Sequence, residues 1–279
     1  VLGLVIWLVV GYLGFRGAVR DANARLATRY PNARGALDRD PGLALFNTTN
    51  VLVIGADRTG HADSFQVIHL DAGRNLVSTI ALPRDLLVRS MPGGAARLNQ
   101  AFARTVGGKP NVGLTVQVVK ELTGLPIHHV LVIDFGGFVR LIDAVGGVDV
   151  VSPKALRSRF DGYVYRFPKG RVHLDGRHAL AYARVRKNAL DRTDSDVTRG
   201  ERQQQVMQAL KAKLLGPGTL LRLRTLGADV MAPTATDLSA NEILMLGWVQ
   251  FRAQKKLQCN LGGDPLTVSG IGSVLEPSA

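Results

Sequence analysis

Short apolar runs that alternate with helix-like segments constrain this chain more than any other feature of its sequence. NVLVIG near residue 50, HVLVIDF near residue 130 and VDVV near residue 150 are compact runs typical of buried strands. FQVIHL and LVSTIAL flank DAGRN, whose Asp and Gly favour a turn, so they predict a hairpin. The segments expected to be helical are residues 98–106, 112–122, 138–145, 199–215 and 238–251. Strands alternating with helices predict a layered α/β sandwich.

Two of the expected helices carry more specific signals. Ser239 and Glu242 are three residues apart at the start of LSANEILMLGWVQF, the spacing of a capping box. The helix from residue 199 is expected to bury one apolar face, formed by Val206, Met207, Leu210, Leu214 and Leu215.

Composition narrows the class of partner. The 279 residues, 46% of them apolar, are enough to fill the core of one large α/β domain. The net charge of +13 favours a partner that carries phosphate, whether nucleic acid, lipid head groups or a phosphorylated substrate. No helix-turn-helix, zinc finger or aromatic-interleaved basic pattern is present, so no specific nucleic-acid binding is expected. Cys259 is the single cysteine, which excludes an internal disulfide and predicts a lone buried thiol.

The first fifteen residues, VLGLVIWLVVGYLGF, contain no charge and are followed by Arg16. They predict the truncated end of a transmembrane helix or uncleaved signal anchor, with a buried core helix as the alternative. Residues 16–49 are expected to form a juxtamembrane stalk or helix, and residues 50–279 the folded domain.

Two acidic residues follow the NVLVIG strand in GADRTGHADS. Asp57 and Asp63 lie just past the carboxyl end of that strand, where ligands of open α/β sheets usually bind. Two carboxylates there could hold Mg²⁺ or Mn²⁺ together with substrate phosphate. The alternative is an Asx turn in which Asp57 only shapes the loop.

A second polar pair follows the next expected strand, in ALPRDLL. Pro83 fixes the backbone, and Arg84 and Asp85 then project from the same sheet edge. An arginine there can grip a phosphate while the aspartate orients it or takes a proton. A surface ion pair is the alternative.

The stretch YARVRKNALDRTDSDVTRGERQQQ carries the third cluster. Arg184 and Arg186 are two apart, so in an extended segment they point the same way. Arg199, Arg202 and Gln203 share one face of the expected helix, with Arg199 near its anion-favouring start. The alternative is a solvated basic loop.

Taken together and in this order, the three clusters resemble the LytR-CpsA-Psr family of cell-wall glycopolymer ligases. LNQAFA, LTGLPIHHVLVIDFGGFVRLIDAVGGVDV, LDGRHALAYARVR and DVTRGERQQQV extend the resemblance over about residues 50–215. The resemblance implies a three-layer α/β/α sandwich with a central mixed β-sheet, tethered by one N-terminal transmembrane helix outside the cytoplasmic membrane. It also implies transfer of a glycopolymer phosphate from a polyprenyl-pyrophosphate carrier to a peptidoglycan sugar hydroxyl.

The resemblance further implies a role for each matching residue. Asp57 and Asp63 match the family's metal-binding aspartates, which implies Mg²⁺ or Mn²⁺. The residues that match its catalytic and pyrophosphate contacts are Arg84, Asp85, Arg184, Arg186, Asp196, Arg199, Arg202 and Gln203. Phosphoryl transfer needs mainly positioning and charge neutralisation, which these residue types supply.

One departure from the family pattern leaves other functions open. His61 and Ala62 stand before Asp63, where members usually carry an arginine and a small hydroxyl residue. The alternatives are a polyprenyl-pyrophosphate phosphatase and a non-catalytic module that binds polyprenyl phosphate or an anionic wall polymer. A composition rich in Ala, Arg and Gly indicates a high-GC organism and favours an actinobacterial wall, such as arabinogalactan on peptidoglycan.

Overall fold

The computed structural model describes residues 2–42, 45–57, 60–160, 162–185, 188–191, 196–214 and 229–277. Its backbone divides into two compact units. The sheet unit holds Phe15–Asp134 and Thr234–Ala279, and the helical unit holds Val1–Gly14 and Phe135–Pro233.

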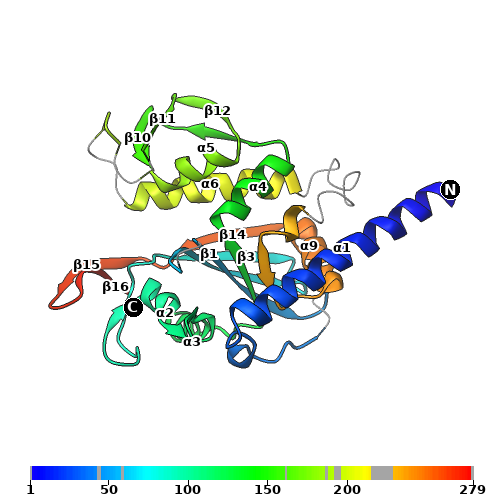
Figure 1. Ribbon diagram of the computed structural model, residues 1–279, viewed down its shortest axis with the longest axis horizontal. Helices are drawn as coiled ribbons and strands as arrows, with labels where there is room; N and C mark the ends of the chain where they lie inside the picture. Colours follow the sequence, from blue (N-terminus) through cyan, green and yellow to red (C-terminus); the bar gives the residue numbers. More distant parts are fainter. Residues whose placement is uncertain are drawn as a thin grey trace. The chain divides into compact units, whose positions relative to one another are not determined.

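A six-stranded mixed sheet forms the centre of the sheet unit (Figure 1), in the order β13-β8-β1-β2-β3-β14. β1 pairs parallel with β8 and antiparallel with β2, and β14 pairs parallel with β3. β2 and β3 form the predicted hairpin, whose turn places Asn75 at a φ of 50°. The strands are β1 (Thr48–Ala56), β2 (Ala62–Asp71), β3 (Leu76–Leu82), β8 (His129–Asp134), β13 (Thr234–Thr236) and β14 (Lys255–Asn260).

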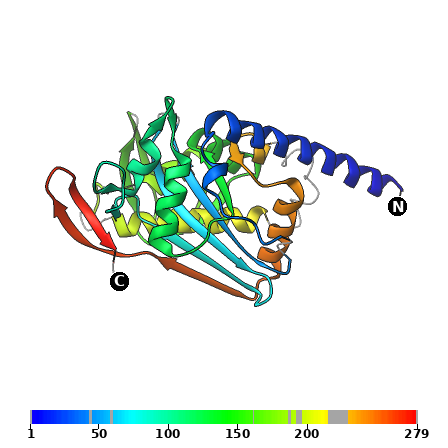
Figure 2. The same ribbon diagram turned by 90° about the horizontal axis from the view of Figure 1, so that it is seen from below.

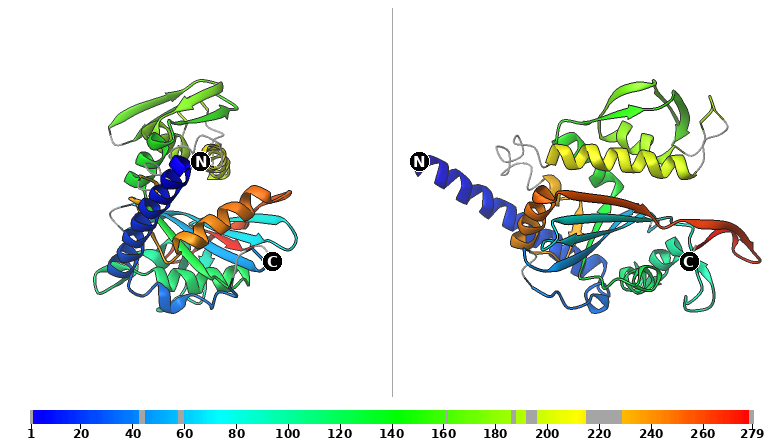
Figure 3. Two further views of the ribbon diagram at one scale, coloured as in Figure 1. Left: turned by 90° about the vertical axis from the view of Figure 1, so that its right-hand side faces the viewer. Right: turned by 180° about the vertical axis from the view of Figure 1, so that it is seen from behind.

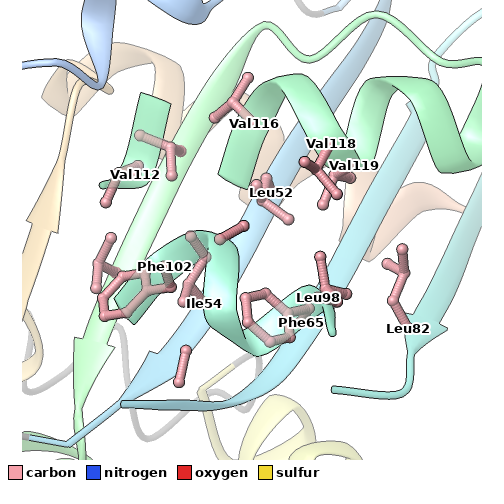
Figure 4. Packing of buried hydrophobic residues seen from close by; sticks show 14 of the residues in the cluster. Leu52, Ile54, Phe65, Leu82, Leu98, Phe102, Val112, Val116, Val118 and Val119 are labelled. Carbon is pink, nitrogen blue, oxygen red and sulfur yellow. The ribbon is translucent and has the colours of Figure 1, made fainter. Parts of the chain in front are cut away.

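The two faces of this sheet support different cores because successive residues of a strand point to opposite faces. Leu52 and Ile54 of β1 pack against α2 (Leu98–Ala103) and α3 (Val112–Thr123), as Figure 4 shows. Val51 and Val53 of the same strand pack on the side of α9 (Ala240–Arg252). The sheet unit is therefore layered, with helices on both faces of a central mixed sheet, as predicted.

The helix α1 (Leu2–Arg29) contributes to the core of the sheet unit from Phe15 onward. One of its faces is buried there: Phe15, Val19, Ala22 and Leu26. Arg25 Nε donates a hydrogen bond to the carbonyl of Thr234 at 2.8 Å, which fixes the helix to β13. Residues 16–49 were expected as a juxtamembrane stalk or helix; they are helical as far as Arg29 and supply part of this core. Among the described helices, none has both the length and the apolar character needed to span a membrane.

Local signals set the ends of several helices. Ser239 Oγ accepts from the N–H of Glu242 at 3.2 Å, and Glu242 Oε2 accepts from the N–H of Ser239 at 2.6 Å, which confirms the predicted capping box. Gly124, with a φ of 66°, ends α3 as expected. The predicted helix from residue 98 is shorter than expected, because Arg104 is extended and β6 follows it.

Short strands complete the sheet unit. β15 and β16 extend beyond the sheet as a hairpin after β14 (Figure 2). The bounds are η1 (Arg34–Ala36), β4 (Leu87–Val88), β5 (Ala96–Arg97), β6 (Thr105–Val106), β7 (Lys109–Pro110), β15 (Gly263–Val268) and β16 (Gly272–Pro277). Cys259 is exposed, so the prediction of a buried thiol is wrong. It lies on β14, the last strand in the sheet order, where every side chain is exposed.

Within its described residues, the helical unit packs α4, α5 and α6 with two strand pairs, and Figure 3 shows α5 and α6 alongside these strands. The elements are α4 (Phe135–Ala144), β9 (Val148–Ser152), β10 (Leu156–Phe160), β11 (Tyr163–Phe167), β12 (Gly170–Leu174), α5 (Gly176–Arg184) and α6 (Asp196–Leu214). Val206 and Leu210 of α6 are buried, and Met207 and Leu214 pack against the same core. Four of the five residues of the predicted apolar face are thus confirmed, and Leu215 lies outside the described residues.

Candidate active site

The predicted acidic and basic residues of the sheet unit gather at one edge of the central sheet. Ala56 at the end of β1 pairs with Ala62 at the start of β2, and Phe65 pairs with Leu82 at the end of β3. Because β2 runs antiparallel to both neighbours, the segments that hold Asp57, Asp63 and Arg84 meet at this edge. Open α/β sheets bind ligands in the same position.

Arg84 is held between two carboxylates. Its Nη1 donates to Asp63 Oδ1, and its Nε donates to Asp85 Oδ2 at 3.4 Å. Only 19% of the Arg84 side chain is exposed, so this pair differs from a solvated surface ion pair. Burial alone would lower the pKa of Arg84, but the hydrogen bond that it donates to Asp63 and the charges of Asp63 and Asp85 raise it above its ordinary value. The guanidinium is therefore a fixed positive charge at the sheet edge.

Asp85 also faces a second arginine, Arg97, which no sequence motif indicated as a site residue. Its Oδ1 lies 3.9 Å from Arg97 Nε, while its Oδ2 accepts from Arg84. Arg97 Nη2 in turn donates to the carbonyl of Ile271 at 2.9 Å. Both carboxylate oxygens of Asp85 thus face guanidinium groups, which favours an anchoring role over that of a base. Arg97 lies twelve residues along the chain, and no local pattern connects it to Asp85.

Asp57 shapes its own loop. Its Oδ1 accepts from the N–H of His61 at 2.8 Å, and its backbone N–H donates to the His61 carbonyl at 2.8 Å. The Nδ1 of His61 lies 3.7 Å from Asp57 Oδ2. Asp57 therefore shapes its loop, as the alternative expected, but it does so through the N–H four residues along rather than two as in an Asx turn.

The donor set at this edge fits a hard divalent cation only in part. Asp57 and Asp63 offer carboxylate oxygens, the ligand class that Mg²⁺ and Mn²⁺ prefer. Among the described side chains, no third acidic, histidine or cysteine group joins them to form a three-ligand cluster. A cation held here would take its remaining ligands from water and substrate phosphate, as Mg²⁺ commonly does.

The helical unit carries the other predicted contacts, beginning with Arg184. Arg184 is the last residue of α5, so it does not lie in the extended segment expected from the sequence. The helix forms because Asp175 caps its start by accepting from the N–H of His178, and because alanine-rich segments favour helix. The guanidinium of Arg184 lies 5.3 Å from the ring centroid of Phe135, a cation–π contact. Arg186 lies outside the described residues.

The remaining predicted contacts belong to α6. This helix begins at Asp196, three residues before the expected start, and the Asp196 side chain is outside the described part. Arg199 and Gln203 are half-buried and four residues apart. Arg202 is only 4% exposed, and its Nη2 donates to the carbonyl of Val185 at 2.6 Å. Arg202 therefore holds the segment after α5 against α6.

Comparison with known proteins decides the family. The model of the LytR_cpsA_psr family matches residues 29–259. The chain belongs to the LytR_cpsA_psr family. The match includes every predicted site residue of both units.

Curated relatives of this chain are teichoic acid transferases by name. The polyisoprenyl-teichoic acid–peptidoglycan teichoic acid transferase TagU of Bacillus cereus (strain AH820) is 34% identical over 197 residues, 69% of this chain and 60% of TagU. The transferase TagV of Bacillus subtilis (strain 168) is 30% identical over 227 residues, 78% of this chain and 54% of TagV. The chain thus spans about half to three fifths of the length of these relatives.

Solved structures share the fold. The crystal structure of B. subtilis TagV aligns with a TM-score of 0.70 and 25% identity, covering 83% of this chain and 91% of that one. The structure of TagT bound to LIIa-WTA aligns with a TM-score of 0.67 and 23% identity, covering 86% of this chain and 88% of that one. Because the identity to TagT is only 23%, that likeness supports a shared fold alone.

Proposed function

We propose that this protein is a phosphotransferase that ligates a glycopolymer from a polyprenyl-pyrophosphate carrier to a peptidoglycan sugar hydroxyl. The observation that carries the proposal is Arg84, held between Asp63 and Asp85 beside Asp57 at the ligand-binding edge of the sheet. Membership of the LytR_cpsA_psr family and the transferase names of its relatives support the class of donor and acceptor. A wall glycopolymer such as teichoic acid or arabinogalactan fits that class.

The reaction replaces a phosphoanhydride bond of the donor with a phosphodiester bond to the acceptor. The acceptor hydroxyl oxygen forms a bond to the phosphorus nearest the glycopolymer, and the bond from that phosphorus to the bridging oxygen breaks. Polyprenyl phosphate leaves, and the hydroxyl proton passes to a base or to solvent. Negative charge on the non-bridging and leaving oxygens is what the site must stabilise.

Arginines supply most of that stabilisation in our proposal. Arg84 is fixed in its orientation by its two carboxylate partners, so it grips a phosphate without first being ordered. Further pyrophosphate contacts are Arg184, Arg186, Arg199 and Gln203, with Asp196 at the start of α6. Arg202 positions the segment that leads to Arg186 instead of contacting the pyrophosphate. Its side chain is buried and donates to the backbone carbonyl of Val185.

Asp57 and Asp63 are the residues that would hold Mg²⁺ or Mn²⁺ beside the pyrophosphate. A divalent cation there would neutralise charge on the phosphate oxygens. Asp63 would then be shared between the cation and Arg84. Asp57 is already held at the end of β1 by the N–H of His61.

We further propose that the uncharged run before Phe15 belongs to a single-pass membrane anchor and that the folded units lie outside the cytoplasmic membrane. The uncharged run and the lipid-linked donor support this placement. Fractionation of cells that express the full chain, with protease added to intact spheroplasts, tests it. Recovery of the protein in the soluble cytoplasmic fraction would refute the anchor.

His61 favours a second candidate, a non-catalytic module that binds polyprenyl phosphate or an anionic wall polymer. Its side chain is 69% exposed and faces Asp57 at the position where the family usually has an arginine. Histidine lacks the planar, permanently charged fork of arginine, so it stabilises a developing phosphate charge less well.

The deciding experiment measures release of polyprenyl phosphate from a pyrophosphate-linked glycan in the presence of a peptidoglycan acceptor. Arg84→Ala should abolish release. Arg74→Ala is the matched control, because Arg74 is an exposed arginine in the turn at the far end of β2 and β3. Donor binding without turnover in the wild type would favour the binding module. Release of polyprenyl phosphate at the same rate without the acceptor, with water taking its place, would identify a phosphatase.

A further inference from the structure

A second polar cluster lies in the sheet unit at the other end of the central strands from Asp57. His129 pairs with Val51 near the start of β1, whereas Asp57 follows the end of that strand. His129 begins β8, and three carboxylates from two other segments of the chain lie around it. Asp40 precedes β1, Asp237 follows β13, and Glu242 is in the first turn of α9. The proposed phosphotransfer makes no use of these four residues.

The imidazole of His129 is held in one orientation. The residue is 5% exposed, and its Nδ1 lies 2.7 Å from Asp237 Oδ2. The other oxygen of Asp237 accepts from the N–H of Val130 at 2.7 Å, so the carboxylate is itself fixed. Histidines that bind metals typically donate one ring N–H to such a carboxylate and present the other nitrogen to the ion. In this cluster the presented nitrogen is Nε2.

One distance at Nε2 is close to the separation of two ligands of one ion, and a third candidate ligand lies nearby. Asp40 Oδ2 lies 3.2 Å from Nε2, and ligand atoms of Asp40, His129 and Glu242 all lie within 4.8 Å of one another. Two atoms bound at about 2.0–2.1 Å to a tetrahedral Zn²⁺ lie about 3.3 Å apart. Asp40 and Glu242 are half-buried rather than enclosed, so an ion can reach the cluster from solvent.

Charge balance also calls for a cation. A neutral imidazole carries one N–H, yet both ring nitrogens of His129 face carboxylates. With His129 neutral and acting as a ligand, the three carboxylates carry three negative charges, and one divalent ion would neutralise two of them.

We propose that Asp40, His129 and Glu242 bind a Zn²⁺ ion, with water as the fourth ligand and Asp237 orienting the imidazole. Mixed nitrogen and carboxylate ligands suit Zn²⁺ better than Mg²⁺. The ion ties the segment before β1 to β8 and to the start of α9. Its role is to fasten these elements, and it is independent of the proposed cation at Asp57 and Asp63.

Calorimetric titration of the chelator-treated full chain with Zn²⁺ alone tests the site. We expect one equivalent to bind, and Asp40→Asn and Glu242→Gln each to weaken binding at least about tenfold. Glu242→Gln is suited to this test because glutamine preserves the capping box with Ser239, so the helix start should survive. Asp237→Asn should weaken binding about 10- to 100-fold without removing a ligand.

Two matched substitutions serve as controls. Glu121→Gln changes an exposed glutamate of α3 away from the cluster, and Asp63→Asn removes a carboxylate at the other end of the central strands. Both should retain the wild-type Zn²⁺ affinity. Absence of stoichiometric Zn²⁺ binding to the wild type would overturn the proposal and leave the cluster as an ion pair only. Equal affinity in all variants, or loss of binding in Asp63→Asn alone, would overturn it as well.

Discussion

Replacing Asp63 with asparagine distinguishes the two roles proposed for this carboxylate, which are to pair with Arg84 and to bind a divalent cation. Asparagine keeps the size of the side chain but removes the charge that faces Arg84 Nη1. Hydrogen bonds to charged groups contribute about 1.5–3 kcal/mol. The Arg84 and Asp63 side chains are 19% and 25% exposed, and Asp85 still pairs with the guanidinium. We therefore expect the free energy of unfolding to fall by about 1–2 kcal/mol, at the lower end of that range.

Asp57→Asn provides the comparison. The Oδ1 of asparagine can still accept from the N–H of His61, so the loop keeps its hydrogen bond. The free energy of unfolding should change by no more than about 0.5 kcal/mol. If both aspartates hold the proposed cation, however, both substitutions should abolish EDTA-sensitive turnover while donor binding persists.

Urea unfolding followed by circular dichroism gives the stabilities, and polyprenyl phosphate release with and without EDTA gives the turnover. Stability of Asp63→Asn equal to that of the wild type would refute the argument that the Arg84 pair is energetically significant. Turnover that is indifferent to EDTA and to both substitutions would refute the assignment of a cation to these aspartates.

Substitutions at four further positions have different expected results. Arg202→Ala should lower the free energy of unfolding by about 2 kcal/mol, measured by urea unfolding, because it removes a buried charged donor from the Val185 carbonyl. Arg199→Ala should leave stability within about 0.5 kcal/mol but abolish tight binding of the pyrophosphate lipid in isotherms; unchanged affinity would show that α6 presents only a solvated face. Ser239→Ala should cost about 1 kcal/mol through loss of the α9 cap, whereas Ser239→Asp, which can also cap, should restore most of it. Leu26→Ala should cost about 2–5 kcal/mol in thermal or urea unfolding, since this α1 side chain is fully buried; a change under 0.5 kcal/mol would show that α1 is not part of the core.

Local sequence signals predicted the elements whose causes are local. The capping box of Ser239 and Glu242 depends on two residues in one turn, and the β2–β3 hairpin depends on the turn between its strands. The end of α3 at Gly124 follows from a backbone conformation that glycine adopts readily. Each of these predictions is confirmed.

Strand pairing and side-chain exposure that depend on distant parts of the chain could not be predicted from the sequence. VDVV was expected to be a strand and is one, but it pairs with β12 in the helical unit rather than in the central sheet. Cys259 is exposed because β14 takes the edge position, which its own residues do not encode.

The candidate site shows the same division. The grouping of Asp63, Arg84 and Asp85 could be anticipated because each follows or begins a strand at one sheet edge. The contact of Asp85 with Arg97 could not, since it arises from the packing of β5 and the chain near Ile271. His129 and Asp237 are 108 residues apart, and no periodicity links them. The metal at Asp57 and Asp63 and the pyrophosphate contacts of α5 and α6 stay predictions.

The buried face of α1 decides where this chain can be shortened for recombinant production. A fragment that begins at the first strand, near residue 50, would lose Val19, Ala22 and Leu26 and open an apolar trough along the sheet unit. Each such side chain contributes about 1.5–3 kcal/mol when buried, apart from the smaller alanine, so the loss is comparable to the whole stability of many domains. The exposed trough would also favour aggregation. A cut placed before Phe15 keeps that face intact and removes only the most apolar turns of the helix.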